Sequence, residues 1–197
     1  NNGVTGLQTW NFTINASSNE VNNLWTTAYA SINNMNLFLD KVDAASSKIS
    51  ADKLANYKGE ARFLRALAYF SLVNIYAQPY TKDNGASLGL PLRLKGENGS
   101  GNSNNLKRST VAEVYAQILD DLNFAETSLP ANYATQDLNV TRAHKNTAIA
   151  LKVKAYLAMG RYSDVVKEAE KIVPTAAPFK AATGVRHELN ANFAAIF

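Results

Sequence analysis

The chain has 197 residues, of which 46% are hydrophobic and 18% charged, a balance typical of one globular domain with a sizeable core. It contains no cysteine, which excludes disulfides, thiol chemistry and cysteine-based zinc sites. The formal net charge is +4. Part of this excess lies in one Gly/Asn-rich loop without a basic stripe or interleaved aromatic residues, so we expect no nucleic-acid partner.

The N-terminal region is polar and rich in asparagine, with Trp10 and Phe12 as isolated aromatic residues. Ser17 and Glu20 have the spacing of a capping box, which predicts that the first helix begins there and runs to about Val42. One face of this helix carries residues that recur every three or four positions. They are Trp25, Tyr29, Ile32 and Asn36.

A second helix is predicted from Ser50, a candidate N-cap, to about Ala77, antiparallel to the first. Between Ala61 and Ala77 only four residues are polar: Arg62, Arg65, Ser71 and Asn74. A helix that is apolar nearly all round is typical of a buried position, so we expect other elements to cover it on all sides. An arginine inside a core needs a partner, and Arg65 is expected to pair with Asp120 or Asp121, with Asp121 preferred, as a structural ion pair.

Residues 78–108 form a long loop with five of the ten glycines of the chain. Loops of this length without secondary structure are usually functional or disordered. Thr110 and Glu113 form a second capping-box pattern, which opens a helix to about Ser128. The predicted buried stripe of that helix is Val111, Val114, Ile118, Leu122 and Ala125.

A further helix is predicted over residues 141–159, with Gly160 as a left-handed C-terminal cap. Its partner helix should begin at Ser163 and end near Val173. A last helix is expected from about Val185 or Asn190 to Phe197. The passage over residues 155–174 resembles one tetratricopeptide repeat in its glycine turn and small residues.

Five sequence blocks in order resemble the SusD/RagB family of surface nutrient-binding lipoproteins of Bacteroidetes. The first is the W-x-x-x-Y-x-x-I-x-x-x-N pattern that begins at Trp25. The others are Glu60-Ala-Arg-Phe-Leu-Arg-Ala66 with Tyr69-Phe70, Leu88-Gly-Leu-Pro-Leu92, Arg108-Ser-Thr-Val111 with Glu113-Val-Tyr115, and Thr141-Arg142 with the segments up to Gly160-Arg-Tyr162.

The resemblance implies an all-α, tetratricopeptide-like fold of antiparallel helix pairs, with residues 1–197 as a single domain. It also implies a non-catalytic protein of the outer-membrane surface that captures a nutrient, most often an oligosaccharide, and delivers it to a SusC-like TonB-dependent transporter. Family members carry a lipoprotein signal and a lipidated cysteine, which this sequence lacks. We therefore expect an internal piece of a longer protein, which would contact the membrane only through that missing anchor. The alternative is a helical-repeat scaffold that binds a protein or peptide and no sugar.

No catalytic, metal or cofactor site is predicted. The two histidines, His144 and His187, do not have metal-ligand spacing, and no nucleophile-elbow, Walker or dinucleotide-binding motif is present. The aromatic residues outside the periodic helices are the candidate ligand contacts, because sugars stack their C–H faces on rings. These are Trp10, Phe12 and Tyr80, and the alternative for each is that the ring packs its loop against the helices.

Overall fold

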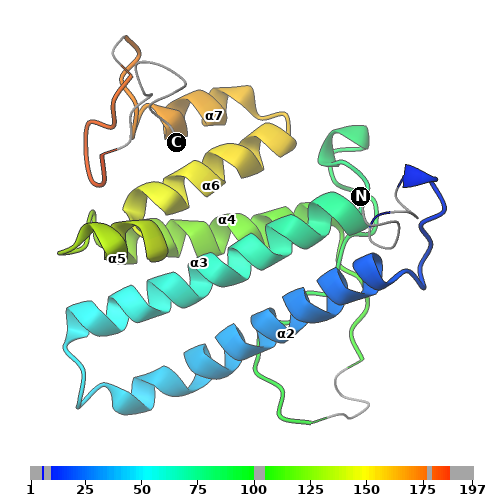
Figure 1. Ribbon diagram of the computed structural model, residues 1–197, viewed down its shortest axis with the longest axis horizontal. Coiled ribbons are helices and arrows are strands. Elements are labelled where there is room, and N and C mark those ends of the chain that lie inside the picture. Colours follow the sequence, from blue (N-terminus) through cyan, green and yellow to red (C-terminus); the bar gives the residue numbers. More distant parts are fainter. Residues whose placement is uncertain (1–5, 7–9, 100–104, 177–178, 187–197) are drawn as a thin grey trace.

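The computed structural model describes residues 6, 10–99, 105–176 and 179–186 of the chain. Over these residues the protein is all-α, as the sequence predicts, and the described part contains no β-strand beyond an isolated bridge between Leu88 and Thr110 (Figure 1). The α-helices are α2 (Asn19–Lys41), α3 (Ala51–Tyr76), α4 (Val111–Ser128), α5 (Gln136–Thr141), α6 (Lys145–Ala158) and α7 (Tyr162–Ala169).

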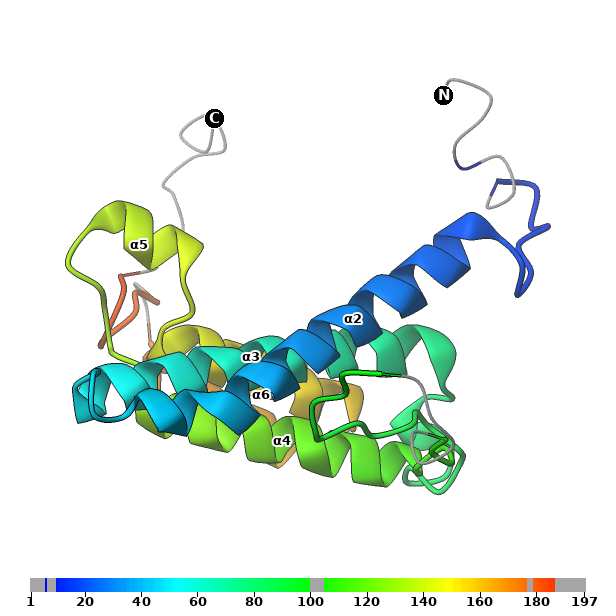
Figure 2. The ribbon, with the colours of Figure 1, turned by 90° about the horizontal axis from the view of Figure 1, so that it is seen from below.

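The long helices lie side by side in chain order, so that α2 packs on α3, α3 on α4, α4 on α6 and α6 on α7 (Figure 1). α2 and α3 run antiparallel, as expected from the short connection between them. The short helix α5 stands away from one side of this layer (Figure 2). None of the described helices combines the length and the apolar character that a membrane crossing requires.

The start of α2 differs from the prediction by one residue. The N-cap is Ser18, and Ser17 lies in the preceding turn, where its N–H donates to the side chain of Asn15 at 2.8 Å. The Ser18 hydroxyl accepts a hydrogen bond from the Asn15 N–H at 3.0 Å instead of capping the helix. Because Asn15 organises this turn, the predicted capping box between Ser17 and Glu20 does not form.

The capping box at α4 is confirmed. The Thr110 hydroxyl accepts from the Glu113 N–H at 3.2 Å, and the Thr110 N–H donates to the Glu113 carboxylate at 2.7 Å. All residues of the predicted α4 stripe are buried: Val111, Val114, Ile118, Leu122 and Ala125.

The helix predicted over residues 141–159 is interrupted. The backbone is extended at Arg142 and His144, which separates α5 from α6. His144 is buried and is the N-cap of α6, where its N–H donates to the Thr147 hydroxyl at 2.9 Å. Gly160 has a φ of +70°, which confirms the left-handed cap after α6.

The C-terminal predictions have mixed outcomes. α7 is shorter than predicted, because it ends at Ala169 and turns continue to Val173. The last predicted helix lies mostly outside the described residues, and Val185 itself is in a bend.

The prediction that α3 is covered on all sides is wrong. The helix buries Arg65, Ala66, Tyr69, Leu72 and Val73 against its neighbours. Three large apolar residues face outward instead: Leu64, Leu67 and Ile75 are 46%, 39% and 62% exposed. α2 and α4 cover two sides of α3, and the described residues leave its third side open. The apolar sequence therefore predicts a central helix correctly. It does not show how much of the surface of that helix other elements cover.

Candidate functional site

The long loop between α3 and α4 is held in a fixed path by side chains of α2 and α3. Tyr29 donates its hydroxyl to the Pro91 carbonyl at 2.9 Å. Tyr69 donates to the Arg93 carbonyl at 2.8 Å and accepts from the Arg93 N–H at 2.7 Å. Asn36 also donates to the Arg93 carbonyl, at 2.9 Å. The loop is therefore bound through its backbone, as an extended segment laid along the helices.

The same arrangement continues to Glu97. Asn33 binds both backbone groups of Glu97, with its amide donating to the carbonyl at 2.9 Å and its oxygen accepting from the N–H at 2.8 Å. Asp40 accepts from the Gly96 N–H at 2.8 Å. Gly96 lies so close to α2 that an added Cβ would be 2.6 Å from Leu37 Cδ2 and 2.9 Å from Leu37 Cα. Only glycine fits this approach without movement of the backbone.

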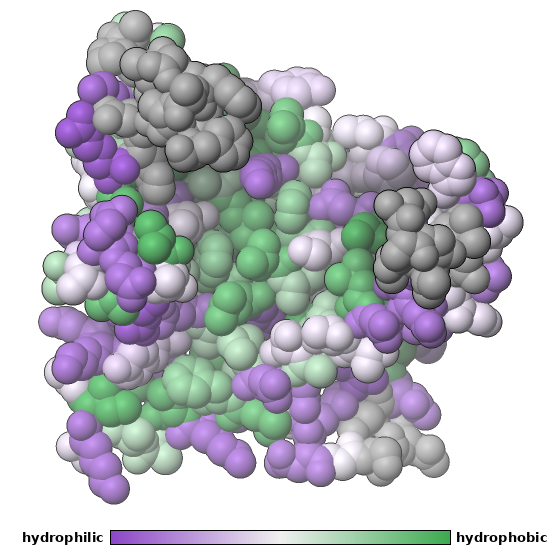
Figure 3. Space-filling view, viewed as in Figure 1, coloured by the Kyte–Doolittle hydropathy of each residue, from purple (hydrophilic) through white to green (hydrophobic). Residues whose placement is uncertain are grey.

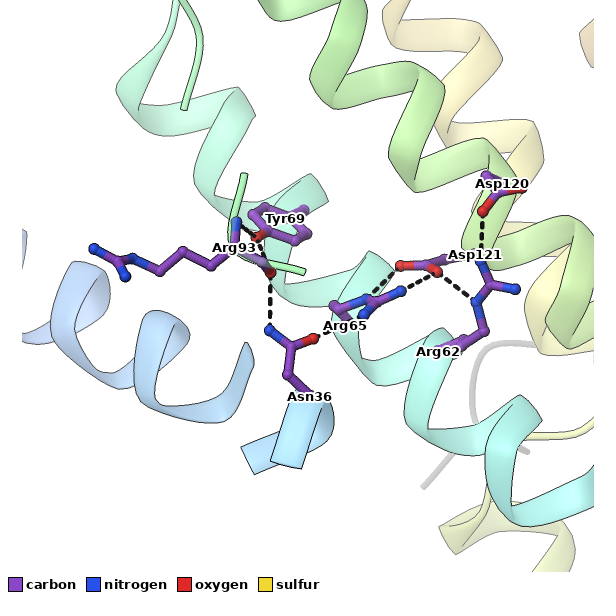
Figure 4. Close-up of polar contacts among 7 residues, drawn as sticks. All are labelled: Asn36, Arg62, Arg65, Tyr69, Arg93, Asp120 and Asp121. Atoms are coloured by element: carbon purple, nitrogen blue, oxygen red, sulfur yellow. Dashed lines mark hydrogen bonds and ion pairs between the residues drawn. The ribbon is translucent and has the colours of Figure 1, made fainter. Parts of the chain in front are cut away.

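A buried polar network connects this loop to α4 (Figure 4). Asp121 on α4 accepts two hydrogen bonds from Arg65, at 2.6 and 2.8 Å, and one from Arg62 at 2.7 Å. Arg65 also donates to the Asn36 oxygen at 2.7 Å, and Asn36 donates onward to the loop. Asp121 and Asn36 are fully buried and Arg65 is 6% exposed. The network therefore joins α4, α3, α2 and the loop through the ion pair expected between Arg65 and Asp121.

In this network, the attraction between the charged groups outweighs the cost of burying them. Burial alone disfavours the charged guanidinium of Arg65, but the hydrogen bonds and the negative charge of Asp121 outweigh it and raise the pKa of Arg65 above its ordinary value. A buried pair with several hydrogen bonds specifies one arrangement of the helices, because each alternative would leave a charge unpaired.

The three aromatic candidates divide into two groups. Trp10 and Phe12, which precede α2, are 77% and 95% exposed. Tyr80 is half-buried and packs edge-on against Tyr115 of α4, with ring centroids 5.6 Å apart. For Tyr80 the geometry is that of a ring packed against the core, whereas the other two rings are open to solvent.

The described residues contain no group of three or more His, Cys, Asp or Glu side chains placed to hold a metal ion. His144 caps α6 through its backbone N–H, and His187 lies outside the described residues. Sequence reasoning missed the side chains that bind the loop backbone. A signal was present, because Asn36 shares the apolar face of its helix with Ile32, and a buried amide requires hydrogen-bonding partners.

Comparisons with known proteins agree with this fold. Residues 3–157 match the SusD-like family described as starch-binding and associating with the outer membrane. SusD-like protein P25 of Formosa agariphila is 27% identical over 139 residues, which cover 70% of this chain and 23% of that protein. The chain thus spans about a quarter of the length of this curated relative.

Two solved structures extend the comparison. A SusD superfamily protein from Bacteroides fragilis, at 2.05 Å resolution, is 35% identical with a TM-score of 0.79, and the match covers 90% of this chain and 40% of that one. A SusD-like carbohydrate binding protein from Bacteroides vulgatus is 26% identical with a TM-score of 0.66, and the match covers 75% of this chain and 30% of that one.

Proposed function

Because this chain belongs to the SusD-like family, we propose that it is the helical-repeat domain of a longer, non-catalytic protein that binds an oligosaccharide. The observation that carries the proposal is the pair of exposed aromatic rings, Trp10 and Phe12, beside the end of the helical layer at which α2 begins. The start of α2 and the end of α3 meet at this end, as the packing of Tyr76 against Trp25 shows, with ring centroids 5.1 Å apart. The segment with Trp10 precedes α2 at that end, and the long loop begins there and then runs along α2 toward Asp40 (Figure 1).

The chemistry of these groups suits a sugar. Aromatic rings offer flat apolar faces to sugar C–H groups, and they lose little conformational freedom on binding. Trp10 and Phe12 lie among asparagine, threonine and serine residues, whose side chains can bind hydroxyl groups. A relative with the same fold is described as carbohydrate binding. We assign Trp10 and Phe12 as ligand contacts, and we assign Tyr80 to the support of the loop.

At the level of the whole protein, we propose that the bound oligosaccharide is delivered to a SusC-like TonB-dependent transporter. The family description places starch binding at the outer membrane, and this supports a surface location with a lipid anchor in the complete protein. A helical layer whose loop is fixed through its backbone between Pro91 and Glu97 is suited to presenting a ligand, because presentation requires a stable surface and no bond cleavage.

Calorimetric titration with a panel of oligosaccharides tests the binding proposal. Trp10→Ala is expected to weaken binding of the best ligand by about tenfold, since an aromatic contact residue typically contributes more than about 1 kcal/mol. Tyr162→Ala is the matched control, because Tyr162 on α7 is also a highly exposed aromatic residue, at 68% against 77% for Trp10. If both variants bind as the unaltered chain does, the assignment of Trp10 is wrong. If the unaltered chain binds no oligosaccharide, the alternative of a polypeptide-binding scaffold gains support.

A further inference from the structure

The positive charge of the chain is concentrated in and around α6 and α7. Residues 141–186 contain nine of the 20 lysines and arginines but only three of the 16 aspartates and glutamates. The rest of the chain therefore has eleven basic and thirteen acidic residues, so the net charge of +4 arises from this stretch alone. A local excess of one sign raises the local concentration of ligands of the opposite sign.

The basic stretch encloses a hollow of about 280 Å³, which we call the α6 pocket. Its walls come from the end of α4, the start of α6 and the segment after α7, which lies beside the start of α6 (Figure 1). Asn146 on α6 donates to the Thr183 carbonyl at 2.7 Å and so holds that segment in place. Next to it, a Cβ added at Gly184 would lie 2.9 Å from the Ala131 carbonyl. The walls of the α6 pocket are thus closely fitted to each other.

The α6 pocket lies at the opposite end of the helical layer from Trp10. Ala131 in its wall follows α4, and the end of α4 packs on the first half of α3, where a Cβ added at Gly59 would lie 3.1 Å from Ser128 Cβ. Trp10 instead precedes α2 at the end where α3 finishes. Hydrophobic residues gather over the middle of the face shown in Figure 3, and hydrophilic residues are more frequent toward its edges. A ligand in the α6 pocket would therefore be separate from one at Trp10.

Four charged side chains beside the α6 pocket form a closed ring and cancel each other. Glu126 contacts Lys152 at 2.6 Å and Lys171 at 3.0 Å. Glu168 contacts the same two lysines, at 3.0 and 2.9 Å. Lys145 also lines the pocket, and it is exposed and forms no ion pair within the described part of the chain. The ammonium group of Lys145 therefore gives the α6 pocket a net positive charge.

The remaining lining suits a sugar unit better than an apolar ligand. Thr183 and Asn146 carry polar side chains, and sugar hydroxyl groups can both donate hydrogen bonds to such groups and accept them. Ile149 adds an apolar side chain to the lining, against which the C–H face of a sugar can pack. The volume equals that of about nine water molecules at about 30 Å³ each, which is room for one sugar unit.

We propose that the α6 pocket binds one anionic sugar unit, with Lys145 as the partner of its carboxylate or sulfate group. A hydrogen bond between two charged groups is about twice as strong as one between neutral groups, so the negative charge should decide which sugars bind. The choice of a sugar rests on the oligosaccharide function proposed above, whereas the requirement for negative charge rests on the lining of the pocket.

Amide NMR spectra of the chain, recorded during titration with four probes, test this proposal. The probes are methyl glucuronide, a sulfated glucose, the neutral methyl glucoside and inorganic sulfate. We expect shifts at Ile149, Thr183 and Gly184, and binding of at least one anionic sugar at least about tenfold tighter than binding of methyl glucoside. The glucuronide and the sulfated glucose show which anionic group is preferred. Lys145→Met should abolish the preference for the anionic sugar.

Lys154→Met is the matched control, because Lys154 is an exposed lysine of the same helix that does not line the α6 pocket. Its preference should equal that of the unaltered chain. Equal loss in both variants would overturn the proposal in favour of general attraction by the basic stretch. Absence of shifts at the pocket, or equal binding of anionic and neutral sugars, would also overturn it.

Inorganic sulfate separates a sugar site from a site for an anion alone. If inorganic sulfate binds as tightly as the sulfated glucose and shifts the same amides, the pocket does not recognise a sugar and the proposal is wrong. Trp10→Ala should leave the shifts at the α6 pocket unchanged, because the two places lie at opposite ends of the layer. The assignment of Trp10 and the proposal for the α6 pocket can therefore fail separately.

Discussion

The two sides of α3 use their charged residues in different ways. On the enclosed side, Arg65 binds Asp121 and Asn36, and through Asn36 it holds the backbone of the loop. On the open side, Glu60 and Arg142 bind each other and leave the surrounding surface apolar. The comparison teaches that similar ion pairs serve two purposes on one helix. One is buried and joins three helices and the loop, and the other is partly exposed and joins α3 to the segment between α5 and α6.

The largest expected effect is at the enclosed side. Arg65→Ala would leave Asp121 buried with only the partly exposed Arg62 as a charged partner, and removal of one member of a buried pair typically costs about 3–5 kcal/mol. We expect the variant to unfold or to melt at a much lower temperature, as measured by circular dichroism. An unchanged melting temperature would show that the network does not fasten the helices.

A smaller effect is expected where the loop meets α2. Gly96→Ala introduces a methyl group that overlaps Leu37, and overpacking of this kind costs about 1–3 kcal/mol. Gly99→Ala is the matched control, because an added Cβ at Gly99 has no neighbour within 4 Å. Urea denaturation should separate the two variants. Equal stabilities would mean that the loop can shift away from α2 without cost.

A pH-dependent effect is expected where α4 meets α6 and the turn after α7, because Glu126 binds Lys152 at 2.6 Å and Lys171 at 3.0 Å. Burial disfavours the charged carboxylate, but the hydrogen bonds and charges of the two lysines outweigh it and lower the pKa of Glu126 below its ordinary 4.5. A lowered folded-state pKa stabilises the protein above the ordinary value, and this stabilisation is lost as the pH falls through the folded-state pKa.

Glu126→Gln should therefore lower stability at pH 7 by about 1–2 kcal/mol, because a neutral hydrogen bond of about 1 kcal/mol replaces a charge-assisted one of about 1.5–3 kcal/mol. The deficit should shrink below the ordinary pKa as Glu126 of the unaltered chain becomes protonated. Urea melts at pH 7 and at pH 3 make the comparison. A deficit of equal size at both pH values would contradict the assignment.

The smallest effect is expected at the open side. Leu64→Ser in the isolated chain removes an exposed side chain, and such substitutions usually change stability by less than about 0.5 kcal/mol. Leu72→Ser is the buried comparison on the same helix and should destabilise strongly. If Leu64→Ser destabilises the isolated chain as much as Leu72→Ser does, the outer face of α3 is part of the core and the two sides of α3 do not differ.

The fold was predictable where local patterns decide the structure. The Thr110 capping box, the α4 stripe and the Gly160 cap depend on residues close in sequence, and the structure confirms them. The break at Arg142 was not predictable from periodicity, because it accompanies the pairing of Arg142 with Glu60, which is 82 residues away. The open side of α3 was missed for a similar reason, since composition shows that a helix is apolar but not what covers it.

The candidate site was only partly predictable. The ion pair between Arg65 and Asp121 follows from the cost of an unpaired buried charge. The binding of the loop by Asn33, Asn36 and Asp40 involves backbone atoms about 60 residues away, and no side-chain pattern in the loop records it.

Because the loop is bound through its backbone, its side chains can vary in sequence. The side chains that hold the loop bind carbonyl groups, which every residue supplies, and N–H groups, which every residue except proline supplies; they are Tyr29, Asn33, Asn36 and Tyr69. Leu94, Lys95 and Asn98 are exposed. With Gly96 retained, these positions can be replaced without loss of the attachment. One scaffold can thus present many different loop sequences, which makes the segment a natural place to diversify recognition by selection or by design.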